Sequence, residues 1–373
     1  MDWRAEFPIL RRKTYLNSCS LGALSEHALA RVAEFHENWH EHGASAWYGT
    51  WIGRLGELRG RVAGMLNATT AEVALTASVS AGLASFASAL HYRKRPRVVV
   101  SDLDFPTLSY AWRARPDVEV VSVPSDDGFT IDPARFAEVV DERTALVATS
   151  HVCYTTGAIL PVRQLAGIAH ARGALLLVDA YQGAGQVPID VRTMGVDVLL
   201  AGPLKWLLGG PGLAYIYVHE TLIAQLAPTV TGWFAARDQF GFDNRRFEPA
   251  DDARRFELGT PALPTVHSAL GGQELIDRVG LAAIRARNRE LTRQLLDALR
   301  ERGHAVRGPA GDDERRSAIV MIRHDDPQRV VAALAEHDVI VDARPGWIRV
   351  SPHFYNTPHD IERFMDVLQR VGA

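Results

Sequence analysis

The sequence predicts an α/β protein in which a large domain with a mainly parallel central sheet is joined to a small α+β domain. Short apolar runs alternate with helical stretches such as residues 133–140 and 162–172, the pattern of strand–helix–strand units. The runs lack the period-two alternation of a strand with one wet face, so they predict strands buried on both faces. They are residues 97–101, 118–123, 145–150, 174–179, 196–201 and 213–218.

The pattern changes after about Pro261, where a long amphipathic stretch at 281–302 begins a different arrangement. It is followed by a predicted strand at 318–322, a helix at 327–337, strands at 339–342 and 347–351, and a final helix at 358–371. We therefore expect a large domain at 31–260 and a small domain at 261–373, with the N-terminal segment 1–30 packed on the small domain.

Composition excludes several classes of protein. A hydrophobic fraction of 47% is enough for a packed core, and a net charge of -3 gives no sign of a nucleic-acid or membrane-surface protein. The N-terminus lacks the apolar stretch of a signal peptide, and no run is long enough to cross a membrane. The two cysteines, Cys19 and Cys153, rule out a disulfide framework. We expect a cytoplasmic protein.

One of the three lysines stands apart from the others. Lys13 and Lys94 follow or adjoin arginines, as solvated surface charge does, whereas Lys205 lies in an apolar run without a charged neighbour. A desolvated lysine has a lowered pKa, which suits an amine nucleophile. The alternative is a lysine whose long side chain reaches water from a strand end, and the run by itself leaves both interpretations open.

Asp179 strengthens the interpretation of Lys205 as a nucleophile. It ends the predicted strand 174–179, and Lys205 follows the next predicted strand, 196–201. Ligands of open α/β sheets bind at the carboxyl ends of strands, and a carboxylate there can keep a pyridine nitrogen protonated. An aspartate that only caps a helix is the alternative.

The small and hydroxyl residues at 76–82 precede a predicted helix at 83–91 and could bind an anion. No nucleotide-binding glycine motif is found.

A rival motif occurs at His36, Glu37 and His40, which match the H-E-x-x-H pattern of zinc hydrolases. On a helix the two histidines would share one face and Glu37 could act as a base. A further histidine that would extend the match is replaced by Ala46. The same pattern is also typical of an exposed polar helix.

Six segments resemble those of fold-type I pyridoxal-phosphate enzymes of the class V aminotransferase group, and within it the kynureninases. Residues 16–24 (LNSCSLGAL), 104–107 (DFPT), 150–157 (SHVCYTTG), 205–212 (KWLLGGPG) and 348–356 (IRVSPHFYN) are similar to kynureninase motifs, and 255–261 (RFELGTP) to a motif of the whole group. The resemblance covers nearly the whole chain and implies the type I transferase fold, with pyridoxal 5'-phosphate as cofactor.

The resemblance implies a role for each matching residue. Lys205 would hold the cofactor as a Schiff base and move protons, and Asp179 would pair with the pyridinium. Gln182 would bond the phenolic oxygen, Phe105 would stack on the ring, and Val79, Ser80 and Trp233 would bind the phosphate. Gly259 and Thr260 would reach the phosphate of the other subunit in a homodimer, and Arg349, with Asn17, would bind the substrate. Without the resemblance, the mid-strand position of Arg349 slightly favours a structural salt bridge over carboxylate binding.

The implied activity is a kynureninase-like hydrolase or β-lyase that cleaves a Cβ–C or Cβ–S bond of an amino acid bound as a Schiff base. Three positions depart from the kynureninase pattern: Leu204, Leu108 and Gln182 stand for Tyr, Asp and His. A class V aminotransferase and the zinc hydrolase are the alternatives. A cysteine desulfurase needs a thiolate, yet no cysteine follows Cys153, so only Cys19 could serve, from the N-terminal loop.

Overall fold

The computed structural model describes residues 3–309 and 311–372. A seven-stranded sheet in the order β2-β8-β7-β6-β5-β3-β4 forms its centre. Strands β7, β6, β5, β3 and β4 run parallel to one another, whereas β8 is antiparallel to both β7 and β2. The strands are β2 (Val73–Thr76), β3 (Arg97–Ser101), β4 (Glu119–Val123), β5 (Thr144–Ser150), β6 (Leu175–Asp179), β7 (Val198–Ala201) and β8 (Ala214–Val218).

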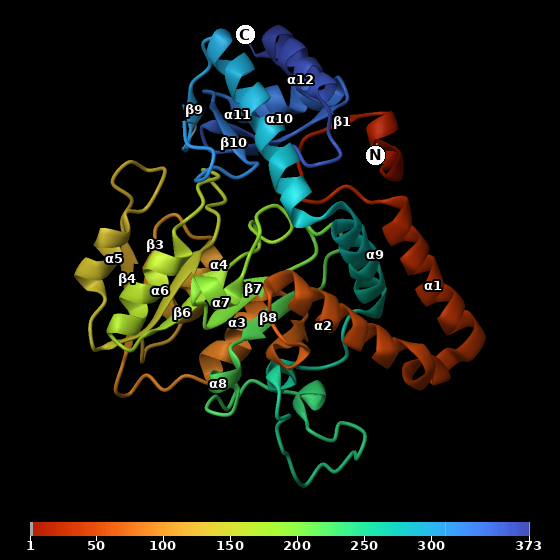
Figure 1. The fold of residues 1–373 in the computed structure, drawn as a ribbon, viewed down its shortest axis with the longest axis vertical. Coiled ribbons are helices and arrows are strands. Elements are labelled where there is room, and N and C mark those ends of the chain that lie inside the picture. The colour runs from red at the N-terminus through yellow and green to blue at the C-terminus, as the bar shows by residue number, and fades with distance from the viewer. Residues whose placement is uncertain (1–2, 310, 373) are drawn as a thin grey trace.

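Helices cover both faces of this sheet (Figure 1). Along β6, Leu176 and Val178 belong to one apolar cluster and Leu177 to another on the opposite face. Because both faces are buried, the strands need no alternation of polar and apolar residues. The helices of this part are α1 (Glu26–His42), α2 (Ile52–Leu66), α3 (Val79–Ser88), α4 (Pro106–Arg113), α5 (Pro133–Val139), α6 (Val162–Ala171), α7 (Val191–Met194), α8 (Glu220–Ile223) and α9 (Leu263–Val279).

A second, antiparallel sheet has the order β12-β13-β10-β9. Its strands are β9 (Val306–Arg307), β10 (Val320–Arg323), β12 (Asp342–Arg344) and β13 (Trp347–Val350), and its helices are α10 (Leu281–Glu301), α11 (Pro327–Glu336) and α12 (Pro358–Val371). Ile322 and Ile348 pack with these helices in one cluster. Met321, on the opposite face, packs with Cys19 and Trp206 of the rest of the chain.

The N-terminal segment joins the second sheet region. Strand β1 (Thr14–Tyr15) pairs in parallel with β11 (Val339–Ile340). Beyond β1, the backbone N–H of Gly22 donates to the carbonyl of Leu204 at 2.9 Å. The segment therefore touches both the small sheet region and the loop that carries Lys205.

The expected α/β class with a mainly parallel sheet is confirmed, while two details differ from the expectation. Helix α3 begins at Val79, four residues earlier than expected, because the Ser78 hydroxyl accepts from the N–H of Ala81 and caps it. Helix α9 packs on α1 so closely that a Cβ at Gly271 would lie 2.5 Å from the Ala28 Cα. The domain boundaries at 30 and 260 stay predictions, and this packing places α9 with the large domain.

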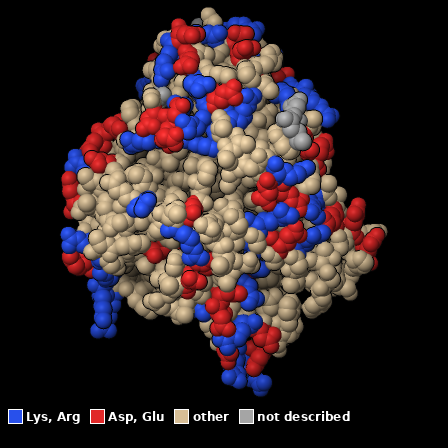
Figure 2. Space-filling model, viewed as in Figure 1, with Lys and Arg blue, Asp and Glu red and all other residues tan. Residues whose placement is uncertain are grey.

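In the described part of the chain, no helix is both long enough and apolar enough to span a bilayer. The cytoplasmic location stays a prediction. On the face seen in Figure 2, positive and negative side chains are interspersed, and neither sign forms one large continuous area. Such a surface lacks the single-sign field that would attract a polyanion.

Candidate active site

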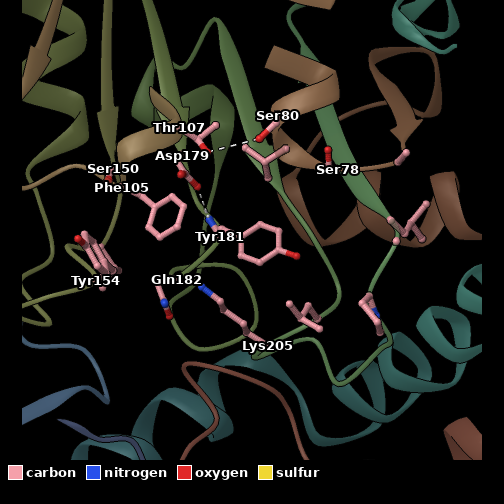
Figure 3. A pocket seen from close by; sticks show the side chains of 17 residues that line it. Ser78, Ser80, Phe105, Thr107, Ser150, Tyr154, Asp179, Tyr181, Gln182 and Lys205 are labelled. Carbon is pink, nitrogen blue, oxygen red and sulfur yellow. Dashed lines mark hydrogen bonds between the residues drawn. The ribbon is translucent and has the colours of Figure 1, made fainter. Parts of the chain in front are cut away.

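A cavity of about 390 Å³ opens at the carboxyl ends of the parallel strands (Figure 3). Asp179 ends β6, Ser150 ends β5, and Lys205 lies in the loop after β7. This position at the strand ends is where open α/β sheets bind ligands. The lining residues are Ala77, Ser78, Val79, Ser80, Phe105, Thr107, Ser150, Val152, Tyr154, Asp179, Tyr181, Gln182, Leu204, Lys205, Pro211, Gly212 and Leu213.

Lys205 is held as a reactive amine. Burial lowers its pKa to about 8, even though the charges of Cys19 and Asp179 act in the opposite direction. Its Nζ lies 4.9 Å from the centre of the Tyr181 ring, within the range of a cation–π contact. A substantial share of the amines is therefore uncharged near pH 8, the form that attacks carbonyls and accepts protons.

Asp179 is a buried carboxyl with few partners. It is 7% exposed, and one oxygen accepts from the backbone N–H of Tyr181 at 2.9 Å. Burial raises its pKa to about 6, against the opposing effects of that N–H and of Lys205. A positively charged ring nitrogen beside it would favour the ionised form, so the carboxyl fits a pyridinium.

The other end of the cavity fits an anion. Ser78, Val79 and Ser80 form the start of α3, a helix of 10 residues whose first backbone N–H groups point out of its end. The hydroxyl of Thr107 lies 3.4 Å from that of Ser80. Among the described lining residues the only cationic side chain is Lys205. Phosphate binding within one chain would thus depend on hydroxyl and backbone donors.

Gln182 and Phe105 both line the cavity (Figure 3), and their cofactor contacts stay predictions. The Gln182 amide is fixed at both ends: its nitrogen donates to the Cys19 carbonyl at 3.0 Å, and its oxygen accepts from the Trp206 indole at 2.8 Å. One N–H of the amide remains for a ligand. Phe105 stands edge-on to Tyr154, with 5.2 Å between ring centres.

Arg349, on β13, lies just behind the cavity wall and is 1% exposed. Its Nη1 donates to the carbonyl of Tyr154 at 3.2 Å, which ties it to a lining residue. Asn17 lies farther from the cavity wall. Its backbone forms a bridge with Ser351, and its side-chain oxygen faces the Cys19 sulfur at 3.9 Å.

Three expected phosphate ligands lie outside the Lys205 cavity of their own chain. Trp233 lines a separate hollow of about 720 Å³ formed by residues 231–248, and its indole donates to the carbonyl of Gln239. Gly259 and Thr260 are exposed on the surface. The Trp233 indole N–H is thus bound within its own chain, whereas Gly259 and Thr260 are exposed to solvent.

The structure adds residues that the sequence did not single out for this site. Tyr181 and Tyr154 line the cavity; Tyr181 lies between Asp179 and Gln182, which was a usable signal. Cys19 is fully buried, and its carbonyl accepts from the Gln182 amide at 3.0 Å. The N-terminal loop therefore brings Cys19 next to a residue of the cavity wall, while Cys19 itself is not among the lining residues.

The remaining candidates lie elsewhere. His36, Glu37 and His40 are exposed on α1. Among the residues the structure describes, no group of three His, Cys, Asp or Glu side chains is placed to hold a metal ion. Burial raises the pKa of the Cys153 thiol, and it is fully buried, so it is a poor nucleophile.

Comparison with known proteins gives one family and several relatives. The family model "Aminotransferase class-V" matches residues 14–364. The uncharacterised aminotransferase YcbU of Bacillus subtilis is 34% identical over 98% of this chain and 96% of its own. The kynureninase of Shouchella clausii is 28% identical over 99% of this chain and 90% of its own.

Solved structures share the fold. The cystine C-S lyase C-DES, in complex with cysteine persulfide, superposes with a TM-score of 0.89 at 23% identity, covering 98% of this chain and 100% of that one. A cysteine desulfurase from Thermococcus onnurineus gives a TM-score of 0.89 at 22% identity, covering 100% and 97%.

Proposed function

Because the chain belongs to the class V aminotransferase family, a family of pyridoxal-phosphate enzymes, we propose that its Lys205 site removes a β-substituent from an amino acid. The reaction would be a kynureninase-like hydrolysis of a Cβ–C bond or the elimination of a Cβ–S group. The observation that carries the proposal is the pair formed by Lys205 and Asp179, an amine and a carboxyl whose pKa values burial moves to about 8 and about 6 in one cavity.

The residues of the cavity fit pyridoxal phosphate. Lys205 would hold it covalently, Asp179 would face its ring nitrogen, and Phe105 would cover its ring. The start of α3 at Val79 and Ser80 would bind the phosphate. When bound, the cofactor supplies an electron sink for charge that develops on the substrate Cα.

The side chains of the chain then perform the proton and positioning steps. The Lys205 amine, with its lowered pKa, would take the proton from the substrate Cα at Nζ. Gln182, whose amide is held by Cys19 and Trp206, would direct its remaining N–H to the cofactor. Arg349 would bind the substrate carboxylate and so fix which Cα bond faces Lys205.

The kynureninase relatives span nearly the whole chain, which supports hydrolysis of a Cβ–C bond. Of the three departures from their pattern, Leu204 lines the cavity, whereas Leu108 is fully buried in the core beneath α4. Leu108 therefore has no direct contact with a ligand, and Leu204 removes a polar group from the cavity wall.

Cβ–S cleavage is the second candidate, and Cys19 favours it. Its carbonyl is bound by Gln182 of the cavity wall, so a Cys19 thiolate would be the group to attack the sulfur of a substrate, forming an S–S bond as the Cβ–S bond breaks and its electron pair stays on Cβ. Transamination is the third, supported by the YcbU relative.

We also propose that the site is completed in a homodimer. Gly259 and Thr260 are exposed, and the loop that follows Trp233 carries Phe242, which is 70% exposed, and Phe247, which is 53% exposed. Exposed aromatic side chains of this size mark protein contacts. A second copy would bring Gly259 and Thr260 to the phosphate end of the neighbouring cavity.

The test incubates cofactor-loaded protein with kynurenine, with cystine and, separately, with alanine plus a 2-oxo acid. We expect anthranilate fluorescence with kynurenine or pyruvate with cystine, and neither with Lys205→Ala. Transfer of the amino group from alanine to the 2-oxo acid, without product from kynurenine or cystine, would replace β-cleavage by transamination. Unchanged turnover in Lys205→Ala would contradict the site itself.

A further inference from the structure

We propose that Asp342 and Arg344 act as a positioning pair for Arg349: Asp342 fixes its guanidinium and Arg344 restores the positive charge that the carboxylate of an amino-acid ligand requires. The inference rests on the proposed function, because it assumes that Arg349 receives that carboxylate. It assigns to Asp342 and Arg344 control over how tightly and in which orientation the ligand is held.

Strand geometry places the three side chains together. In the pairing of β12 with β13, Asp342 lies opposite Arg349, and Arg344 is two residues along the same strand. Side chains of alternate residues share one face of a sheet. Met321, which pairs with Arg349, packs against Cys19 and Trp206 on this same face of the sheet. The face that carries Asp342, Arg344 and Arg349 is therefore turned toward the loop of Lys205 and Trp206.

One carboxylate serves both guanidinium groups. Asp342 Oδ2 accepts from Arg349 Nη2 at 2.5 Å and forms an ion pair with Arg344 Nη1 at 2.8 Å, while Arg344 Nη1 donates to the Ala343 carbonyl at 2.7 Å. The Ser20 hydroxyl donates to the same oxygen at 2.8 Å and accepts from Arg349 Nη2 at 2.8 Å. Burial by itself would raise the pKa of Asp342, but Arg349, Ser20 and Arg344 hold it below its ordinary value. Asp342 is therefore ionised under all ordinary conditions.

Arg349 still has an unused donor. Its Nη2 is held by Asp342 and Ser20, and its Nη1 by the Tyr154 carbonyl. Its Nε is buried and has no hydrogen-bond partner. A guanidinium N–H buried without an acceptor is unfavourable, so the Nε edge is where an incoming carboxylate oxygen would be accommodated.

The charge balance explains why Arg344 is needed. Asp342 and Arg349 alone form a neutral pair, and a second carboxylate beside them would be repelled by Asp342 as much as attracted by Arg349. Arg344 makes the group net positive by one charge. Both arginines lower the pKa of Lys205, which places this positive charge within electrostatic reach of the reacting amine.

The experiment measures the binding of glycine to the cofactor-loaded enzyme by the change in cofactor absorbance, with glycinamide as a probe that lacks the carboxylate. The variants are Arg344→Gln, Asp342→Asn and the double variant. Arg323→Gln is the matched control, because Arg323 lies on the same sheet but pairs with the exposed Asp325 at 3.8 Å. Exchange of the glycine α-protons in D₂O reports whether Cα is correctly oriented.

We expect Arg344→Gln to weaken glycine binding about tenfold, the effect of about 1.4 kcal/mol, with glycinamide changed less than twofold. Asp342→Asn should tighten glycine binding and yet slow α-proton exchange at saturation, because the group of three side chains gains net positive charge while Arg349 loses its ionic anchor. The double variant should return glycine affinity to near the wild-type value while exchange stays slow. A purely structural role would weaken binding in both single variants.

Equal losses for glycine and glycinamide, or weaker glycine binding in Asp342→Asn, would overturn the inference and leave the proposed function intact. If wild-type enzyme that binds the cofactor shows no absorbance change with glycine or with other amino acids, the proposed function fails, and the inference fails with it.

Discussion

Burial of the Asp179 carboxylate should lower the free energy of unfolding of the cofactor-free protein, and Asp179→Asn should restore it. In the fold the pKa of Asp179 is raised from 3.8 to about 6 by burial. The unfolded chain therefore gives up this proton more readily than the folded chain does. Asparagine has the same shape, keeps an oxygen for the Tyr181 N–H, and carries no charge to desolvate.

The magnitude follows from the two pKa values. A shift of about two units corresponds to about 3 kcal/mol in the free energy of unfolding. The penalty is absent below about pH 4, where both states are protonated, grows as the pH rises from about 4 to 6, and is complete above that. For a chain of 373 residues, an unfolding entropy of about 0.8 kcal/mol/K converts 3 kcal/mol to about 4 °C in melting temperature.

The assay is thermal unfolding of cofactor-free wild type and Asp179→Asn at pH 5 and pH 8. We expect the variant to melt about 4 °C higher at pH 8 and about half as much higher at pH 5. Asp325→Asn, whose carboxyl is fully exposed, should change neither value. Added pyridoxal phosphate should raise the melting temperature of wild type more than that of the variant. A variant that melts at or below wild type at pH 8 would refute the account of Asp179.

Three further outcomes are expected. Borohydride reduction of the cofactor-loaded enzyme, followed by peptide mass analysis, should find the cofactor on Lys205 alone among the three lysines. A label on Lys13 would contradict the site. Lys205→Ala should lower turnover at least about a thousandfold. Leu108→Ala should lower the free energy of unfolding by about 2–5 kcal/mol without changing the absorbance of bound cofactor, since Leu108 is fully buried; a lost cofactor signal in folded variant would assign it a role in the cavity. Arg59 donates to the buried Glu257 carboxylate at 2.7 Å. Arg59→Ala leaves that charge without its partner and should lower the free energy of unfolding by about 3–5 kcal/mol at pH 8. Because burial raises the pKa of Glu257, denaturant titration should show a smaller loss at pH 5, and an equal loss would exclude a charge effect.

The strands, and the position of Asp179 and Lys205 at their ends, could be predicted from the sequence because these signals are local. An apolar run that ends at Asp179 and one that precedes Lys205 define both the sheet and its reactive edge. The antiparallel strand β2 was missed because four residues, Val73–Thr76, give little periodicity to detect. Helix α9 was not assigned to the large domain because its partner α1 lies far away in the sequence.

The rest of the site depends on contacts between distant segments, which periodicity and motifs do not report. Cys19 contacts Gln182 of the cavity wall only because the N-terminal segment lies between the two sheet regions. The shared use of Asp342 by two arginines appears only once β12 is paired with β13. The H-E-x-x-H segment is a case in which a motif match was present in the sequence but its residues, His36, Glu37 and His40, lie exposed on a helix surface.

The parallel pairing of β1 with β11 constrains the order in which a newly made chain can mature. Thr14 leaves the ribosome long before its partner Val339, because more than 300 residues of the chain separate them. Domains fold as they emerge, from the N-terminus onward, so the large sheet can form while the first strand still waits. The segment that contains Cys19 can pair with the small sheet region only after Val339 has emerged. Until then a nascent chain holds a formed sheet with an open reactive edge, and active enzyme should appear only after this pairing.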